Sequence, residues 1–281
     1  MPIYKPSELR LFLNELNIHP KKGLSQNFLI DGNIIRKIIE VSQVKEEDVV
    51  LEVGPGPGSL TQALLEKNAD VIAVEMDKVL AHELERLQTP RKQLSIFCQD
   101  ILTFSSQDHL PAVLKEGKKA KLIANLPYHL TTPILTRFCT EENYFSSLTV
   151  MVQEEMGRRM TAQPNTREYS SLTVFLNFYT EATYAFTVSR NCFYPIPKVE
   201  SAIVVLKLKE PPLHGKEAEG FFKLTRTAFE QRRKMLRASL KSIYIPQSVE
   251  KALTQMGVSP LARPEMLSLQ QFLTLYELLK G

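Results

Sequence analysis

Short apolar runs alternate with amphipathic stretches along the chain from Asn33 to about Phe186. A run of about four to eight apolar residues is typical of a buried strand, whereas apolar residues about every three or four positions are typical of a helix. Their alternation predicts repeated strand–helix units that build a parallel sheet. The expected strands are Asp48–Val53, Val71–Glu75, Leu94–Cys98, Lys121–Asn125 and Leu148–Gln153.

The pattern changes after the fifth strand. A helical stretch, Tyr169–Phe178, is followed by two further expected strands, Glu181–Val188 and Ser201–Leu208. Only a proline-bearing loop separates these two strands, so we expect them to pair as a hairpin. The pairing would give the sheet a mixed edge, and the fold class is therefore α/β.

A domain boundary is expected near Lys209, because Pro211 and Pro212 follow the last strand and helical periodicity then continues to the end. We therefore expect one domain at residues 1–209, in which residues 1–32 form an N-terminal segment, and a helical domain at residues 210–281. Helical spacing predicts a continuous helix over Phe221–Lys241 and an amphipathic helix over Leu267–Leu279.

Composition agrees with a soluble globular protein: of 281 residues, 43% are hydrophobic and 23% are charged. Glu8 and Glu15 interrupt the N-terminal stretch where a signal peptide would need a continuous apolar run, so we expect neither secretion nor a membrane span. The three cysteines Cys98, Cys139 and Cys192 show no metal-ligand spacing, which favours a reducing cytoplasm and no metal.

A glycine-rich turn follows the strand that ends at Val53, where Gly54, Gly56 and Gly58 alternate with prolines before a helix. Glycines let the backbone approach a ligand closely, and a helix N-terminus offers free N–H groups. We expect Ser59 to be the N-cap of that helix. Glycine-rich turns also occur as plain tight connections. If this turn binds a ligand, its G-x-G-x-G spacing favours S-adenosylmethionine over NAD, whose fingerprint is G-x-G-x-x-G.

Carboxylates close the next two strands of the expected sheet. Glu75 ends one strand, where its two oxygens can accept hydrogen bonds from vicinal ribose hydroxyls, and Asp100 ends the next, where it can accept an adenine amino group. Each carboxylate alone is also explained as a solvated strand end or a helix N-cap. Because they share the carboxyl edge of the sheet with the glycine turn, they together predict an adenosine-containing ligand.

The fourth strand ends in ANLPYHLTTPIL, which places Asn125, Leu126, Pro127 and Tyr128 at the same edge. Pro127 stiffens the turn, so the Asn125 carboxamide and neighbouring carbonyls become fixed acceptors. Two acceptors would hold the hydrogens of an exocyclic amino group and aim its lone pair at an incoming methyl group, while Tyr128 stacks on the base. A proline-containing turn with a tyrosine packed in the core is the alternative.

A second aromatic residue, Phe193, lies in CFYPIPKVESA, where Pro195 and Pro197 predict a rigid extended loop. Phe193 would cover the other face of a base that has been taken out of its stack. The alternative is that Phe193 and Tyr194 fill a gap between the two domains.

Four segments taken together resemble the ribosomal RNA adenine dimethyltransferases, in particular those of the small subunit. These are KKGLSQNFLID, LEVGPGPGSLTQALL, ANLPYHLTTPIL and CFYPIPKVESAIV, and the resemblance covers nearly the whole chain. It implies a Rossmann-like class I methyltransferase sheet with helices on both faces and a small all-helical C-terminal domain. It also implies S-adenosylmethionine-dependent dimethylation of the N6 amino groups of two adjacent adenosines in a loop near the 3′ end of 16S rRNA, during small-subunit biogenesis.

The resemblance also assigns residue roles. It implies cofactor contacts from Asn27, Leu29, Gly54, Glu75, Asp100 and Asn125. Asn125 would lie between the cofactor and the target base, and Tyr128 and Phe193 match the aromatic residues that stack on that base. Ser25 and Ser170 stand where the family usually has glycine, for which we expect local backbone adjustment. His129 replaces a common asparagine, and we do not expect it to act as a base because the departing proton can pass to water.

Basic residues gather in two short stretches. Arg158 and Arg159 form one, and the other contains Arg232, Arg233, Lys234, Arg237 and Lys241. Such runs are usually solvated helix faces, but beside an adenosine-modifying pocket they favour contacts with RNA phosphates that position the substrate. The net charge of +4 permits an anionic partner without requiring one. We expect the partner to be 16S rRNA in an immature 30S subunit and the enzyme to be a monomer.

Three other functions compete with this prediction. The related methyltransferases of 23S rRNA share the cofactor turn, but the C-terminal segment argues against them. A ribosome-assembly factor on a methyltransferase scaffold is the second, against which Glu75, Asp100 and Asn125 favour retained catalysis. The third is a nicotinamide-dependent oxidoreductase, which the glycine spacing disfavours.

Overall fold

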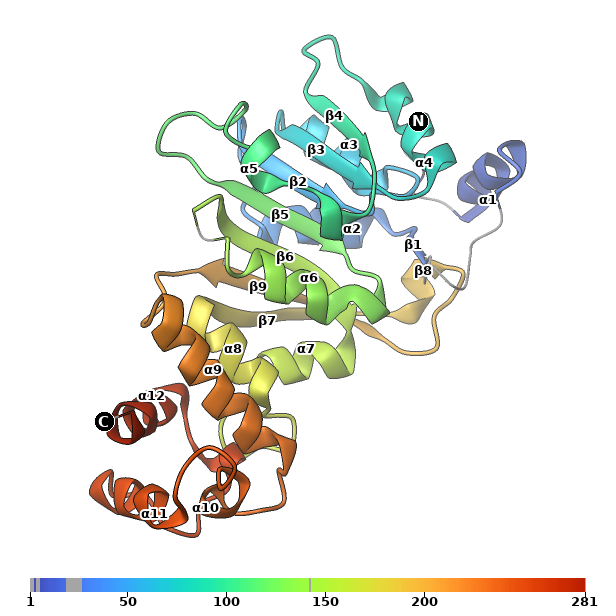
Figure 1. The fold of residues 1–281 in the computed structure, drawn as a ribbon. Coiled ribbons are helices and arrows are strands. Elements are labelled where there is room, and N and C mark those ends of the chain that lie inside the picture. The colour runs from blue at the N-terminus through green and yellow to red at the C-terminus, as the bar shows by residue number, and fades with distance from the viewer. Residues whose placement is uncertain (1–2, 4–5, 19–26, 142, 281) are drawn as a thin grey trace. The chain divides into compact units, whose positions relative to one another are not determined.

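The computed structural model describes residues 3, 6–18, 27–141 and 143–280 (Figure 1). Ser25 therefore lies outside the described residues. The chain divides into two compact units, one formed by Met1–Gly157 and Thr183–Lys209, the other by Arg158–Ala182 and Glu210–Gly281. No helix among the described residues is long and apolar enough to cross a membrane.

The first unit is built on a seven-stranded sheet with the order β4-β3-β2-β5-β6-β9-β7. Its strands are β2 (Val49–Val53), β3 (Asp70–Glu75), β4 (Leu94–Cys98), β5 (Ala120–Asn125), β6 (Phe145–Gln153), β7 (Thr180–Val188) and β9 (Ser201–Leu208). Each of the seven strands predicted from the sequence is present. Strands β2 to β6 pair in parallel, and β9 is antiparallel to β6 with β7 beside it, so the predicted mixed edge is confirmed.

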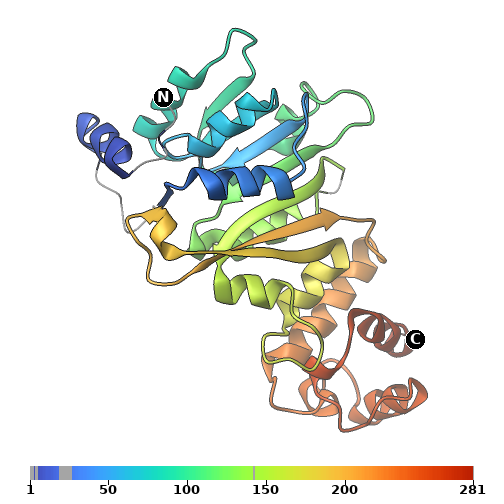
Figure 2. The same ribbon diagram turned by 180° about the vertical axis from the view of Figure 1, so that it is seen from behind.

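Helices cover both faces of this sheet, as the opposite views of Figures 1 and 2 show. They are α2 (Gly32–Val41), α3 (Ser59–Glu66), α4 (Lys78–Glu83), α5 (Ser106–His109), α6 (Thr131–Phe138) and α7 (Glu154–Met160). Burial on both faces explains why β2 consists of five buried residues instead of an alternating pattern. Helix α2 begins where the carboxylate of Asp31 accepts the N–H groups of Asn33 and Ile34 at 2.8 and 3.2 Å.

A small two-stranded ribbon joins two segments that lie far apart in the sequence. Strand β1 (Phe28–Leu29) pairs antiparallel with β8 (Phe193–Tyr194), so that Leu29 lies opposite Phe193. Helix α1 (Pro6–Glu15) packs its Leu9 and Leu13 into an apolar cluster with Phe28. The ribbon, which periodicity did not predict because each strand has two residues, therefore ties the N-terminal segment to the segment that contains Phe193.

The second unit is helical and has its own core. It contains α8 (Ser171–Tyr179), α9 (Gly215–Glu230), α10 (Leu236–Ser239), α11 (Pro246–Gln255) and α12 (Leu269–Leu279). Tyr169, Val174 and Phe178 belong to its buried cluster, and the rings of Phe178 and Phe221 stack 5.2 Å apart. For this reason residues 158–182 group with the C-terminal helices, whereas the sequence placed them with the sheet.

The continuous helix predicted over Phe221–Lys241 is wrong. Helix α9 ends at Glu230, and residues 231–235 form a turn before α10. The N–H of Leu236 donates to the carbonyl of Ala262 at 2.9 Å instead of to a carbonyl of α9. Leu236 and Leu240 are fully buried, so the chain turns to bring both into the core.

Candidate active site

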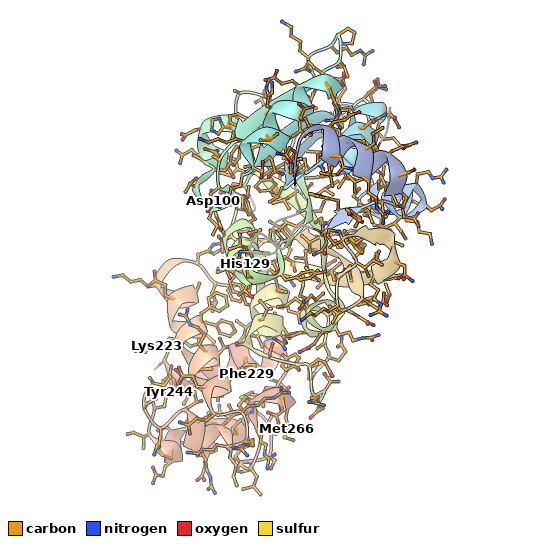
Figure 3. The ribbon with its side chains drawn as sticks, turned by 90° about the vertical axis from the view of Figure 1, so that its right-hand side faces the viewer. Asp100, His129, Lys223, Phe229, Tyr244 and Met266 are labelled. Carbon is orange, nitrogen blue, oxygen red and sulfur yellow. The ribbon has the colours of Figure 1, made fainter. Side chains whose placement is uncertain are left out.

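A cavity of about 1110 Å³, counted with the solvent at its mouth, opens at the carboxyl edge of strands β2 to β5. Open α/β sheets bind ligands at this edge. Six of the predicted site residues line the cavity, namely Asn27, Gly54, Glu75, Asp100, Asn125 and Tyr128. His129 lines it as well, and Figure 3 labels it together with Asp100.

The glycine turn forms the floor of this cavity. Gly56 has a φ of +55°, and a Cβ atom there would lie 3.0 Å from two ring carbons of Phe28. Gly58, with a φ of +84°, is the N-cap of α3, which corrects the prediction for Ser59. The Ser59 hydroxyl instead donates to the carbonyl of Ile3 at 2.9 Å. Glycine is therefore required at these turns by both conformation and close packing.

Glu75 lies at the end of β3 and is 7% exposed. Its Oε2 accepts the N–H of Gly56 at 3.0 Å, and its Oε1 accepts the N–H of Asp77 at 2.9 Å. Burial raises the pKa of Glu75, and the two backbone N–H donors oppose that rise. A carboxylate oxygen has two lone pairs, so each oxygen can still accept one hydroxyl. Glu75 therefore offers two acceptor positions, one on each carboxylate oxygen, which fits the two vicinal hydroxyls of a ribose.

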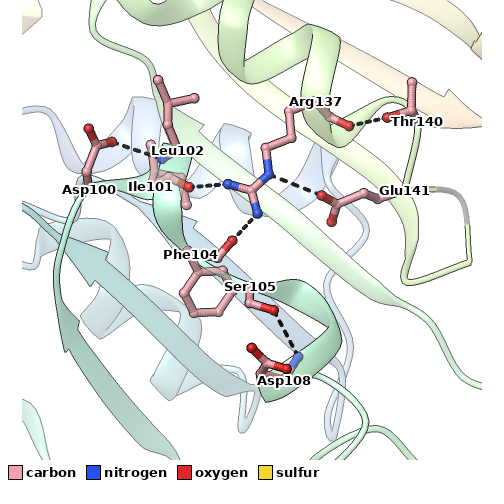
Figure 4. Close-up of polar contacts among 9 residues, drawn as sticks. All are labelled: Asp100, Ile101, Leu102, Phe104, Ser105, Asp108, Arg137, Thr140 and Glu141. Carbon is pink, nitrogen blue, oxygen red and sulfur yellow. Dashed lines mark hydrogen bonds and ion pairs between the residues drawn. The ribbon is translucent and has the colours of Figure 1, made fainter.

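Asp100 follows β4 and is the N-cap of a short 3₁₀ helix, η3 (Ile101–Thr103). Its Oδ1 accepts the N–H of Leu102 at 2.9 Å (Figure 4). The capping and ligand-binding interpretations weighed from the sequence are therefore compatible, because Oδ2 remains as an acceptor on the cavity wall.

Asn125 ends β5 and has its amide group oriented by the N-terminal segment. Its Nδ2 donates to the backbone carbonyl of Asn27 at 3.0 Å, which leaves Oδ1 as the acceptor for a substrate. The next carbonyls differ in availability: that of Pro127 already accepts the N–H of Leu130 at 2.9 Å and the hydroxyl of Thr131 at 3.3 Å. The carbonyl of Pro127 is therefore engaged within the turn itself.

The two predicted stacking residues lie in different surroundings. Tyr128 lines the cavity, and its hydroxyl lies 3.3 Å from that of Ser201. Phe193 is 1% exposed, belongs to a buried apolar cluster and is not among the residues that line the large cavity. Leu29, its partner across the ribbon, lines a smaller neighbouring cavity instead.

The smaller cavity, of about 540 Å³ with open space included, contains a residue that the sequence analysis did not single out as a site. Glu52 is 1% exposed, and burial raises its pKa to about 8, with the nearby Glu75 contributing in the same direction. Thr149 lines the same cavity. Phe28 and Met76, which line the large cavity, were also missed, although both directly follow predicted cofactor residues in the sequence.

The predicted RNA-binding residues divide by their contacts. Arg232 donates to the carbonyl of Thr166 at 3.1 Å, and Arg237 forms an ion pair with Glu250. Arg233 and Lys234 are exposed on the turn between α9 and α10, and Arg158 is exposed on α7. Figure 3 labels Lys223 and Phe229 of α9 and Tyr244 and Met266 of the same helical unit.

Among the described residues, no group of three or more His, Cys, Asp or Glu side chains is placed to hold a metal ion.

A Rossmann-like sheet that carries a glycine turn, a ribose-compatible carboxylate and an N-L-P-Y loop at its carboxyl edge defines an S-adenosylmethionine-dependent methyltransferase that acts on an amino nitrogen. The family model described as ribosomal RNA adenine dimethylase matches residues 17–281. The chain belongs to this family, and its activity is that of an rRNA adenine dimethyltransferase. Membership excludes the nicotinamide-dependent alternative.

Known proteins resemble the chain over almost its full length. It is 67% identical over 276 residues to the ribosomal RNA small subunit methyltransferase A of Protochlamydia amoebophila, covering 98% of this chain and 97% of that protein. It is 46% identical to the protein of the same name from Chlamydia felis, covering 98% of this chain and 95% of that one.

Solved structures confirm the expected fold class. A dimethyladenosine transferase from Plasmodium falciparum matches with a TM-score of 0.75 and 25% identity, covering 88% of this chain and 95% of that one. The 23S rRNA methyltransferase ErmE matches with a TM-score of 0.71 and 29% identity, covering 91% of this chain and all of that one.

Proposed function

We propose that this enzyme dimethylates the N6 amino groups of two adjacent adenosines near the 3′ end of 16S rRNA, within an immature 30S subunit. The observation that carries the proposed mechanism is the hydrogen bond from Asn125 Nδ2 to the carbonyl of Asn27, which fixes an amide acceptor on the wall of the cofactor cavity. The high identity to small-subunit methyltransferases supports the choice of substrate over 23S rRNA.

The residues present fit S-adenosylmethionine, which supplies an electrophilic methyl group on a sulfonium when it is bound. Glu75 accepts the two ribose hydroxyls, and Asp100 accepts the adenine amino group through Oδ2. Gly54 would border the methionine portion, and Asn27 would contact the cofactor from the N-terminal segment; both residues line the cavity. Leu29 lines only the smaller cavity, so its contact with the cofactor stays a prediction.

The target amino group is held by two acceptors on this chain. In the first transfer, Asn125 Oδ1 and the carbonyl of Leu126 would accept the two N6 hydrogens, which would turn the nitrogen lone pair out of conjugation with the ring and towards the cofactor. In the second transfer the nitrogen carries one hydrogen, and one of these acceptors would hold it. A neutral amine in this geometry is already a nucleophile, and its orientation is the main contribution of the protein to the rate. The proton leaves to water after transfer, so no side chain is needed as a general base.

Tyr128 covers one face of the flipped base. Its hydroxyl is held at the start of β9 by Ser201, so the ring is fixed by its edge. Stacking of this kind is worth about 1–3 kcal/mol per base and offsets the cost of taking the adenine out of its stack. Phe193 is buried in the core, so its stacking on the second face stays a prediction that requires the ring to leave its present packing.

RNA phosphates are bound by basic side chains of the helical unit. Arg233 and Lys234 offer exposed charges for direct contacts, whereas Arg232 and Arg237 are engaged with Thr166 and Glu250 and also stabilise the turn on which those charges lie. Arg158 contributes from α7. Phosphate contacts position the RNA, and its sequence is selected through shape and the flipped base.

We further propose that the enzyme acts as a monomer in the cytoplasm. Cys98, Cys139 and Cys192 are free thiols, which fits a reducing compartment.

The test is transfer of radiolabelled methyl groups from S-adenosylmethionine to immature 30S particles that lack the modification, followed by nucleoside analysis. Particles of 50S and isolated 23S rRNA serve as parallel substrates. Dimethyladenosine in 16S rRNA alone is the expected result. Absence of incorporation into any substrate, despite measurable cofactor binding, would instead indicate an assembly factor that has kept only the scaffold.

A further inference from the structure

Arg137, on α6, has all three of its guanidinium nitrogens engaged (Figure 4). Nη1 donates to the carbonyl of Ile101 at 2.8 Å, and Nη2 donates to the carbonyl of Phe104. Nε donates to Oε1 of Glu141 at 3.2 Å. The side chains of Arg137 and Glu141 are 26% and 20% exposed, so the charge pair is partly shielded from water.

The two carbonyls belong to one short segment, Asp100–Phe104, that follows β4. At its start, Asp100 caps η3 and faces the cofactor cavity. At its end, Phe104 is fully buried, with its ring edge-on to Phe97 at 5.5 Å and stacked on His109 at 4.9 Å. The segment is therefore held in place by the packing of the Phe104 ring and by the hydrogen bonds from Arg137.

Helix α6, in contrast, continues the opposite wall of the same cavity. It begins at Thr131, directly after the 3₁₀ helix η4 (Tyr128–Leu130), whose residues line the cavity. Arg137 therefore connects the wall that contains Asp100 to the wall that contains Tyr128. These two walls follow different strands of the sheet, β4 and β5.

Only arginine provides this connection. Its planar fork presents several N–H donors in a fixed arrangement, whereas a lysine has one ammonium group on a flexible stem. A lysine at position 137 would keep the positive charge near Glu141 but would lose the simultaneous contacts with Ile101 and Phe104.

We propose that Arg137 is a positioning residue. It holds the Asp100–Phe104 segment in a fixed position relative to the N-L-P-Y loop, and this makes the cofactor site selective for the adenine amino group. The inference rests on the proposed role of Asp100 as the acceptor of that amino group. Arg137 is not among the residues that line either cavity, and it acts through the backbone of Ile101 and Phe104.

The test compares two ligands that differ only along one edge of the base. S-adenosylhomocysteine carries the 6-amino group beside an acceptor N1, and S-inosylhomocysteine carries a 6-oxo group beside an N1–H donor. Their dissociation constants are measured by titration calorimetry for the wild type, Arg137→Lys, Arg137→Met and Asp100→Ser. Serine can still cap η3 but lacks the carboxylate. Arg91→Met is the matched control, because Arg91 forms only exposed contacts, among them a 3.9 Å ion pair with Glu46.

We expect the wild type and Arg91→Met to prefer S-adenosylhomocysteine by about tenfold or more, as one charge-assisted hydrogen bond allows. Arg137→Lys should lose most of that preference while its affinity for S-inosylhomocysteine changes less than about twofold. A thermal melt of each variant shows whether it folds. If Arg137→Met does not fold, the comparison rests on Arg137→Lys alone.

An equal loss of affinity for both ligands would show a merely structural role for Arg137 and would overturn the inference. An unchanged preference in Arg137→Lys, together with a lost preference in Asp100→Ser, would overturn the inference and leave the proposed role of Asp100 intact. A preference that survives in Asp100→Ser would overturn both.

Discussion

The buried carboxyl of Glu52 gives the enzyme a stability that depends on pH in an unusual direction. Glu52 is 1% exposed, and burial raises its pKa to about 8 from 4.5. A carboxyl group in this environment holds its proton at neutral pH, because the charged form has lost its hydration. Replacement by glutamine keeps the size and removes the titration, so Glu52→Gln isolates the effect.

The magnitude follows from the gap between the two pKa values. Between pH 4.5 and about 8 the folded protein holds a proton at Glu52 that the unfolded chain has released. The contribution of Glu52 to the free energy of unfolding is therefore complete below the pKa that Glu52 has in the unfolded chain. It is lost as the pH rises through the pKa that Glu52 has in the folded protein. A gap of about 3.5 pH units, at about 1.4 kcal/mol each, corresponds to about 5 kcal/mol.

The measurement is urea unfolding at several pH values from 5 to 9, for the wild type and Glu52→Gln. The difference in unfolding free energy between the two proteins, plotted against pH, removes the contributions of all other groups. We expect this difference to move by about 4 kcal/mol against the wild type over that range, because pH 5 to 9 samples about 3 of the 3.5 pH units between the two pKa values. Glu66→Gln, which changes an exposed glutamate of the same unit, controls for the change of net charge.

Parallel curves for the wild type and Glu52→Gln would refute the reasoning. They would mean that Glu52 is ionised in the folded protein at neutral pH.

Three further predictions address catalysis, the glycine turn and RNA binding. Asn125→Ala should lower methyl transfer by about a hundredfold or more while the melting temperature stays near wild type; near-normal turnover would contradict its role as acceptor. Gly58→Ala should lower the free energy of unfolding by about 3 kcal/mol and Gly117→Ala by about 1 kcal/mol in urea titrations, because both have positive φ but only the first Cβ would meet a leucine carbon, at 2.6 Å; equal losses would exclude a packing effect. Neutralising Arg233 and Lys234 together should reduce the slope of log affinity for the rRNA substrate against log salt by about 0.7–0.9 per lost contact, and an unchanged slope would refute their phosphate role.

The sheet could be predicted from the sequence because its strands are buried on both faces and stand out as apolar runs between polar helices. The positions of Glu75, Asp100 and Asn125 on one cavity followed from a single rule, that parallel strands bring their carboxyl ends to one edge. That rule needs no tertiary detail.

Contacts between segments far apart in the sequence could not be predicted in the same way. Strands of two residues leave no periodic signal, so the pairing of Leu29 with Phe193 could not be predicted from the sequence pattern. For the same reason the pattern did not indicate that this pairing buries the Phe193 ring. The turn after Glu230 was missed because its apolar spacing fits a helix, and only the bond from Leu236 to Ala262 shows that the chain changes direction. The same holds for the contacts of Arg137, whose two carbonyl partners lie more than thirty residues away.

The chain enters the helical unit at Arg158, returns to the sheet at Thr183 and leaves it again after Lys209. The polypeptide therefore crosses between the units three times, and the core of the helical unit is assembled from two separate stretches of sequence. Truncation after residue 209 would remove only part of the helical unit. Tyr169, Val174 and Phe178 would then remain without the apolar residues that cover them.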